Sequence, residues 1–192
     1  MNQNLSSTAD ASVKEVKLPI SIKVIMIDLD GTLLDTADDL ALAANLMLKD
    51  LGLPEQSTST IRSYIGKGIQ KLVKRTLTGQ LDGEPDAALF AQALPLYEKH
   101  YANNLSVNTR PYPGVLEGIK IMQQAGFKLA CITNKAEAFT LPLLRSTGLY
   151  EQFEIVLSGD SITKKKPDPM PLTHICKHFD VQPHEALLIG DS

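Results

Sequence analysis

Polar residues that could bind a metal ion and a phosphoryl group follow apolar runs at four places in the chain. Each run resembles a buried strand, and the residues after it carry carboxylates, a hydroxyl or an ammonium group. The residues concerned are Asp28 with Asp30, Thr133 with Asn134, Lys166, and Asp191. Hard oxygen ligands suit Mg²⁺, and hydroxyl and ammonium donors suit phosphate oxygens. These residues therefore indicate Mg²⁺-assisted chemistry on a phosphorylated substrate.

Such side chains meet if the runs are parallel strands of one sheet, because ligands bind at the carboxyl ends of these strands. The apolar, β-branched runs predict strands over residues 20–27, 128–133, 155–158 and 186–189. Helical patterns lie between the later strands, over residues 115–124, 137–147 and 169–179. This alternation predicts right-handed crossovers and a parallel sheet. The expected fold class is α/β, with a Rossmann-like parallel core.

A helical segment interrupts this pattern soon after the first strand. It should hold four helices, with apolar faces over 40–51, 60–64, 69–77 and 89–101, the last opened by Pro85 and kinked by Pro95. We predict an α/β catalytic core formed by residues 20–35 and 109–192, and an inserted all-helical cap over residues 36–108. Residues 1–19 are polar and are expected to form a disordered leader.

Several motifs carry a resemblance to a known family. Asp28-Leu29-Asp30-Gly31-Thr32-Leu33 resembles the first motif of the haloacid dehalogenase-like phosphatases. Thr133, Lys166-Pro167 and Gly190-Asp191 fall in the order of the second, third and fourth motifs, and the helical segment falls where members carry a cap. Further stretches resemble the bacterial phosphoglycolate phosphatases, namely Tyr112-Pro113-Gly114-Val115, Ile132-Thr133-Asn134-Lys135, Ser158-Gly159-Asp160, Lys165-Lys166-Pro167-Asp168-Pro169, and Gly66-Lys67-Gly68 with Leu72-Val73.

The resemblance implies a role for each acid. Asp28 would attack phosphorus and form an aspartyl-phosphate. Asp30, expected in a turn that Gly31 permits, would protonate the leaving alkoxide and later activate water. Mg²⁺ would be bound by Asp28, the backbone carbonyl of Asp30, and Asp191.

The resemblance also implies a set of phosphate and substrate contacts. Thr133 and Lys166 would hold the phosphoryl oxygens, helped by backbone N–H groups near Gly31 and Asn134. In the cap, Gly66-Lys67-Gly68 could present Lys67 or backbone amides to a substrate carboxylate, or could simply break a helix. Arg62 is a second candidate of the same kind, and Lys67 or Lys71 would be needed for a Schiff base in a phosphonate hydrolase.

The expected activity is Mg²⁺-dependent hydrolysis of a small phosphorylated acid, 2-phosphoglycolate, to glycolate and phosphate. The alternatives are another small-molecule phosphatase, a pyrophosphatase or a sugar-phosphate mutase of the same superfamily. A dehalogenase is disfavoured because it would not need Asp30 as an acid and base. A phospho-accepting receiver domain also uses a strand-end Asp, Thr and Lys, but it lacks the helical insertion.

Composition excludes other classes. The net charge is −3, from 19 basic and 22 acidic residues, and no basic stripe indicates nucleic acid. No apolar stretch approaches the roughly 18 residues of a membrane span, and the N-terminus has no secretory pattern.

Cys131 and Cys176 are expected to be reduced, buried thiols of a cytoplasmic protein. His174 and His178 lack a third zinc ligand, and Tyr97 and Tyr101 are expected to pack the cap.

The last apolar run is followed at once by Gly190-Asp191-Ser192, where the chain stops. In the family that it resembles, the fourth motif continues to a further acid, a helix and at least one more strand. We therefore expect the 192 residues to be a fragment of a longer phosphatase, with residues 186–189 as an uncovered apolar edge. A fragment without activity is accordingly one of the alternatives.

Overall fold

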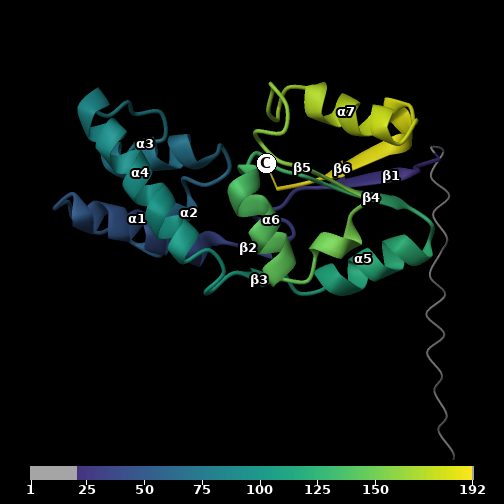
Figure 1. The fold of residues 1–192 in the computed structure, drawn as a ribbon, viewed down its shortest axis with the longest axis horizontal. Helices are drawn as coiled ribbons and strands as arrows, with labels where there is room; N and C mark the ends of the chain where they lie inside the picture. Colours follow the sequence, from purple (N-terminus) through teal and green to yellow (C-terminus); the bar gives the residue numbers. More distant parts are fainter. Residues whose placement is uncertain (1–20, 192) are drawn as a thin grey trace, which may run out of the picture.

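The computed structural model describes residues 21–191, so the predicted leader at 1–19 and Ser192 lie outside the described residues. Figure 1 shows a sheet flanked by helices and, beside it, a separate group of helices. The strands are β1 (Val24–Ile27), β2 (Leu34–Asp35), β3 (Arg110–Pro111), β4 (Lys128–Ile132), β5 (Ile155–Leu157) and β6 (Ala186–Ile189). The helices are α1 (Ala37–Asp50), α2 (Thr58–Arg62), α3 (Ile69–Thr78), α4 (Ala87–Asn103), α5 (Val115–Gln124), α6 (Glu137–Ser146) and α7 (Met170–His178), with short 3-10 turns at Tyr150–Gln152 and Pro183–Glu185.

The main sheet is parallel, in the order β5-β4-β1-β6. Its central strand β1 alternates between two apolar layers. Val24 and Met26 pack in the cluster that contains Ile175 of α7, whereas Ile25 and Ile27 pack with residues of α5 and α6. Figure 1 shows α7 on one side of the sheet and α5 and α6 on the other. Covering on both faces explains the continuous apolar run and confirms the predicted fold class.

Helices α1 to α4 form a four-helix segment between β2 and β3, apart from the sheet in Figure 1. Its apolar cluster contains the fully buried rings of Tyr97 and Tyr101, as predicted for these tyrosines. Phe139 of α6 joins this cluster, and its ring centroid lies 5.0 Å from that of Tyr101. One aromatic contact therefore links the segment to the helices of the sheet.

Some element boundaries differ from the sequence predictions. The first strand begins at Val24 rather than at residue 20. Helix α4 begins at Ala87 rather than at Pro85, because the Asp86 side chain accepts hydrogen bonds from the first free backbone N–H groups and caps the helix. It continues through Pro95. Strands β2 and β3 pair antiparallel at the base of the segment, and two-residue strands are too short to leave a sequence pattern.

Strand β6 lies at one edge of the sheet, as predicted, and its apolar side chains are exposed. Leu187, Leu188 and Ile189 are each more than one third exposed. Cys131 is fully buried and Cys176 nearly so, and both are free thiols. Burial raises the pKa of Cys131 well above its ordinary value. Within residues 21–191, no helix has the length and apolar character required to cross a bilayer.

A buried carboxylate fastens the two ends of the four-helix segment together. Asp39, in the first turn of α1, has no exposed surface. It accepts hydrogen bonds from the backbone N–H groups of Asn108 at 2.8 Å and Thr109 at 2.8 Å, and from the Thr109 hydroxyl at 2.7 Å. Asp39 therefore joins the chain that enters the segment to the chain that leaves it.

Replacement Asp39→Ala should lower the free energy of unfolding by about 3 kcal/mol, because it leaves buried donors without a partner. Urea denaturation measures this change. Asp38→Ala, one residue earlier and exposed, is the matched control and should stay within about 0.5 kcal/mol of the unchanged protein. Equal stabilities of the two variants would contradict the role of Asp39.

Candidate active site

The predicted site residues at the strand ends converge on one edge of the sheet. Asp28 follows β1, Thr133 follows β4 and Asp191 follows β6. The backbone N–H of Asp28 donates to the Ile189 carbonyl at 2.9 Å, and that of Thr133 donates to the Leu157 carbonyl at 2.9 Å. These bonds continue the strand pairing by one residue, so the side chains at the strand ends start from fixed positions.

Asp28 and Lys166 form the tightest contact of the site. The Lys166 ammonium lies 2.6 Å from Asp28 Oδ2, and both side chains are largely buried. Asp28 Oδ1 accepts a hydrogen bond from the backbone N–H of Leu29 at 2.8 Å. Burial raises the pKa of the Asp28 carboxyl, and the Lys166 charge partly offsets that rise. The cation thus stabilises the ionised carboxylate in a place that water reaches poorly.

Thr133 and Asn134 lie in the turn after β4, with different roles. The Thr133 oxygen accepts a hydrogen bond from the Lys135 backbone N–H at 3.2 Å, which leaves its own proton free to be donated. The Asn134 side chain donates to the Lys166 carbonyl at 3.0 Å, so it ties this turn to the loop that carries Lys166. The predicted phosphate contact of Asn134 is therefore left to its backbone N–H.

Asp30 lies in a turn, as expected, and its carboxylate is held from two sides. Lys135 Nζ lies 3.0 Å from both Asp30 oxygens. The Thr36 hydroxyl donates to Asp30 Oδ1 at 2.7 Å. Thr36 immediately precedes α1, so one partner of Asp30 comes from the sheet side and the other from the base of the four-helix segment.

Gly31 lies in the same turn as Asp30, and its backbone N–H donates to the Leu34 carbonyl at 3.0 Å. Its contact with a phosphate stays a prediction. Its φ is +81°, and a Cβ at this position would overlap the Asp191 carboxylate. Gly31 therefore provides space, and Asp191 fills it, with Oδ1 accepting from the Thr32 hydroxyl at 3.2 Å.

The donors at this edge fit Mg²⁺. Asp28 follows β1, just before the Asp30 turn, and the absence of a side chain at Gly31 in that turn leaves room for the Asp191 carboxylate. All three expected ligands are oxygens, the type that Mg²⁺ prefers. Within residues 21–191, no group of three His, Cys, Asp or Glu side chains is placed to hold a metal ion. The expected set needs only two such side chains, because Asp30 would contribute its carbonyl.

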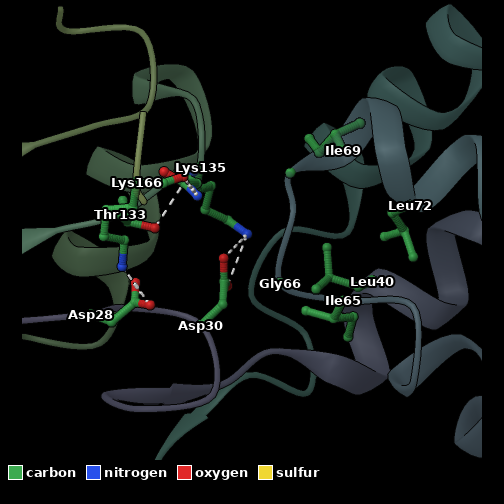
Figure 2. Close-up of a pocket in the computed structure, with 12 residues that line it drawn as sticks. Asp28, Asp30, Leu40, Ile65, Gly66, Ile69, Leu72, Thr133, Lys135 and Lys166 are labelled. Atoms are coloured by element: carbon green, nitrogen blue, oxygen red, sulfur yellow. Dashed lines mark hydrogen bonds and ion pairs between the residues drawn. The ribbon is translucent and has the colours of Figure 1, made fainter. Parts of the chain in front are cut away.

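A pocket lies between these groups and the four-helix segment (Figure 2). The polar residues come from the sheet side, and the segment contributes an apolar wall with two glycines. The lining residues are Asp28, Asp30, Thr133, Asn134, Lys135 and Lys166, facing Leu40, Ile65, Gly66, Gly68, Ile69 and Leu72. Of the predicted cap residues, Gly66 and Gly68 thus reach the pocket.

Lys67 and Arg62 lie outside this pocket. Lys67 is exposed and lines an adjoining groove with Glu98 and Lys165. Arg62 lies on the other side of Asp30, where its guanidinium is 3.2 Å from Asp35. The side chains opposite Asp28 are therefore apolar, and a polar contact from this wall would have to come from the backbone around Gly66 and Gly68.

Sequence reasoning gave no individual role to Lys135, Thr36 or Gly159. Lys135 belongs to the Thr-Asn-Lys stretch, but a lysine after a strand is usually solvated; here it is 5% exposed. The Gly159 N–H donates to the Lys135 carbonyl at 2.7 Å, and a Cβ at Gly159 would overlap the Asn134 backbone. The Ser158-Gly159-Asp160 stretch therefore supports the turn that carries Thr133.

Comparison with known proteins shows the protein family to which this chain belongs. The model of the family described as haloacid dehalogenase-like hydrolase matches residues 25–192. The chain belongs to this family. The resemblance inferred from the motifs is thereby confirmed, together with the prediction of a phosphatase-type enzyme.

Within this family, the chain is similar to proteins that bear the name phosphoglycolate phosphatase. The chain is 65% identical to the phosphoglycolate phosphatase of Nitrosospira multiformis and 58% identical to that of Thiobacillus denitrificans, in each case over 91% of this chain and 77% of the relative. A crystal structure of a predicted phosphoglycolate phosphatase from Haemophilus somnus 129PT superposes with a TM-score of 0.82 at 33% identity. That match covers 89% of this chain and 77% of the other.

Replacement Gly159→Ala should lower the free energy of unfolding by about 1–3 kcal/mol and reduce phosphate release, because the added methyl group must displace the Asn134 backbone. Thermal unfolding and a phosphate-release assay measure the two effects. Gly118→Ala is the matched control, since nothing lies near that position in α5, and it should raise stability by about 0.5–1 kcal/mol. Unchanged activity in Gly159→Ala would refute the supporting role.

Proposed function

We propose that this chain is an Mg²⁺-dependent phosphomonoesterase that acts through an aspartyl-phosphate on Asp28, with 2-phosphoglycolate as its substrate. The observation that carries the chemistry is the Asp28–Lys166 pair, 2.6 Å apart, beside Thr133 and Asp30 in one pocket. A carboxylate next to a cation and a hydroxyl donor provides both a nucleophile and a binding site for phosphoryl oxygens.

In the first step, a carboxylate oxygen of Asp28 attacks phosphorus, and the bond from phosphorus to the alkoxyl oxygen breaks. Asp30 gives a proton to the leaving alkoxide. Lys166 and Thr133 hold the phosphoryl oxygens, and the ammonium group of Lys166 stabilises their negative charge. Lys166 already contacts Asp28, so it lies where the transferred group would come to rest.

In the second step, water attacks the phosphorus of the aspartyl-phosphate, and the bond from phosphorus to the Asp28 oxygen breaks. Asp30, now a carboxylate, takes the proton from the water and returns to its starting form. Asp28 is released as a carboxylate, and phosphate leaves. Asp28 and Asp30 thus serve both steps, and water is the only co-reactant.

Asp28, Asp191 and the carbonyl of Asp30 would hold Mg²⁺. When bound, the ion reduces the repulsion between the anionic nucleophile and the phosphate dianion. Asp28 must be ionised at the start, because it is the nucleophile, and Asp191 accepts a hydrogen bond from the Thr32 hydroxyl at 3.2 Å. Both side chains offer carboxylate oxygens, the ligand type that Mg²⁺ prefers.

The substrate assignment rests on the relatives and on the shape of the pocket. Proteins that are 65% and 58% identical bear the name phosphoglycolate phosphatase. The wall opposite Asp28 is apolar apart from the backbone at Gly66 and Gly68, which suits a short substrate whose carboxylate meets backbone N–H groups.

We propose that the four-helix segment, with residues 36–108, is the cap and that residues 20–35 and 109–192 form the catalytic core. The free, buried thiols agree with a cytoplasmic location.

Replacement Asp28→Asn should reduce the turnover number by about 10³-fold or more, because the amide is a poor nucleophile. Phosphate release in the presence of Mg²⁺ measures this loss. Asp168→Asn, an exchange of the same kind outside the pocket, should retain activity. Turnover by Asp28→Asn at the rate of the unchanged chain would exclude the covalent route.

A screen of phosphate release with Mg²⁺ should give the highest kcat/KM for 2-phosphoglycolate among that compound, pyrophosphate and sugar phosphates. Chelation with EDTA should abolish activity, and added Mg²⁺ should restore it. Preference for pyrophosphate or a sugar phosphate would move the assignment to another member of the family. Activity that survives chelation would contradict the metal requirement.

A further inference from the structure

Lys135 is a buried cation that takes no part in the proposed reaction steps. Its side chain is 3% exposed and extends from the turn after β4 toward the four-helix segment (Figure 2). A lysine so deeply buried needs partners for its charge. It has two, the carboxylate of Asp30 and the aromatic ring of Tyr101.

We propose that Lys135 is a positioning residue that holds the Asp30 carboxylate in place and connects it to helix α4 through Tyr101. The proposal rests on the proposed function, in which Asp30 moves the protons. Both Asp30 oxygens lie 3.0 Å from Lys135 Nζ, so this contact fixes the plane of the carboxylate as well as its distance.

The backbone of Lys135 is itself fixed, so the side chain starts from one place. Its N–H donates to the Thr133 hydroxyl oxygen at 3.2 Å. Its carbonyl accepts from the Gly159 N–H at 2.7 Å and from the Thr140 hydroxyl at 3.2 Å. The turn that presents Thr133 therefore also sets the origin of the Lys135 side chain.

The far end of Lys135 meets the four-helix segment. Nζ lies 4.8 Å from the ring centroid of Tyr101, a cation–π distance. Tyr101 is fully buried and packs between Tyr97, at 5.9 Å between ring centroids, and Phe139, at 5.0 Å. Its hydroxyl finds no hydrogen-bond partner within residues 21–191, so the ring is the part that contributes. The place of Asp30 thus depends on α4 being packed against the sheet side.

The first test compares kcat and KM for 2-phosphoglycolate. Lys135→Met keeps the length of the side chain and removes its charge. It should lower kcat by about 10²-fold, because a small displacement of a reacting group has that effect, with little change in KM. Lys135→Arg should recover part of the loss. Lys120→Met, an exposed lysine of α5, is the control and should match the unchanged chain.

The second test asks whether Lys135 acts through Asp30. The release of p-nitrophenol from p-nitrophenyl phosphate in a single turnover reports the first step, and this good leaving group needs less help from an acid. Lys135→Met should therefore affect p-nitrophenol release less than it affects hydrolysis of 2-phosphoglycolate. Combined with Asp30→Asn, Lys135→Met should cause little further loss. Losses that multiply in the double variant would overturn the proposal.

Tyr101 provides a second set of variants that leaves the cation in place. Tyr101→Phe keeps the ring and should keep the kcat of the unchanged chain. Tyr101→Leu should lower kcat in the same direction as Lys135→Met, and it carries the test if Lys135→Met does not fold, as judged by thermal unfolding. If the unchanged chain is active and Lys135→Met or Tyr101→Leu has the same kcat, the positioning role of Lys135 is refuted, while the proposed function stands. An unchanged chain that hydrolyses neither ester with Mg²⁺ would refute the proposed function and, with it, the role of Lys135.

Discussion

Several carboxylates lie close together at one edge of the sheet, and the groups around them must offset the repulsion between their negative charges. Asp28, Asp30 and Asp191 lie around one turn, and each has a specific partner: Lys166 for Asp28, Lys135 for Asp30 and the Thr32 hydroxyl for Asp191. Neighbouring carboxylates repel one another, and the buried one, Asp28, is unfavourable unless a cation or hydrogen-bond donors compensate its charge. Parallel strands solve the placement, because their carboxyl ends lie side by side and are extended by backbone bonds to Asp28 and Thr133.

The four-helix segment contributes in a different way. It supplies an apolar wall to the pocket. Thr36, just before α1, donates to Asp30, Arg62 of α2 pairs with Asp35, and Tyr101 of α4 packs over the Lys135 ammonium. Asp39 joins its two ends at Asn108 and Thr109. The segment thus has its own apolar core and also contacts Asp30 and Lys135, the residues to which we assign proton transfer and positioning.

Much of the fold and of the site could be predicted because the relevant signals are local. A continuous apolar run ended by Asp28 indicates a strand covered on both faces, and the ordered motifs up to Asp191 indicate the family. The helices α1, α3 and α5 lie close to their predicted bounds because glycines and periodic apolar residues mark them. Strands β2 and β3 were missed because two residues make no pattern, and α4 begins later than Pro85 because Asp86 caps it.

The sequence by itself determined which residue types end the strands, and therefore the class of chemistry and the family. Only the tertiary structure decided which groups meet. Lys135 and Asp30 are 105 residues apart, and Asp39 and Thr109 are 70 apart, so no local pattern connects them. The same holds for Gly31, whose N–H turns to Leu34 while its missing side chain admits Asp191, and for Lys67, which is exposed outside the pocket. Hydrogen bonds and close approaches between distant segments depend on the folded backbone, and the order of residues along the chain does not contain them.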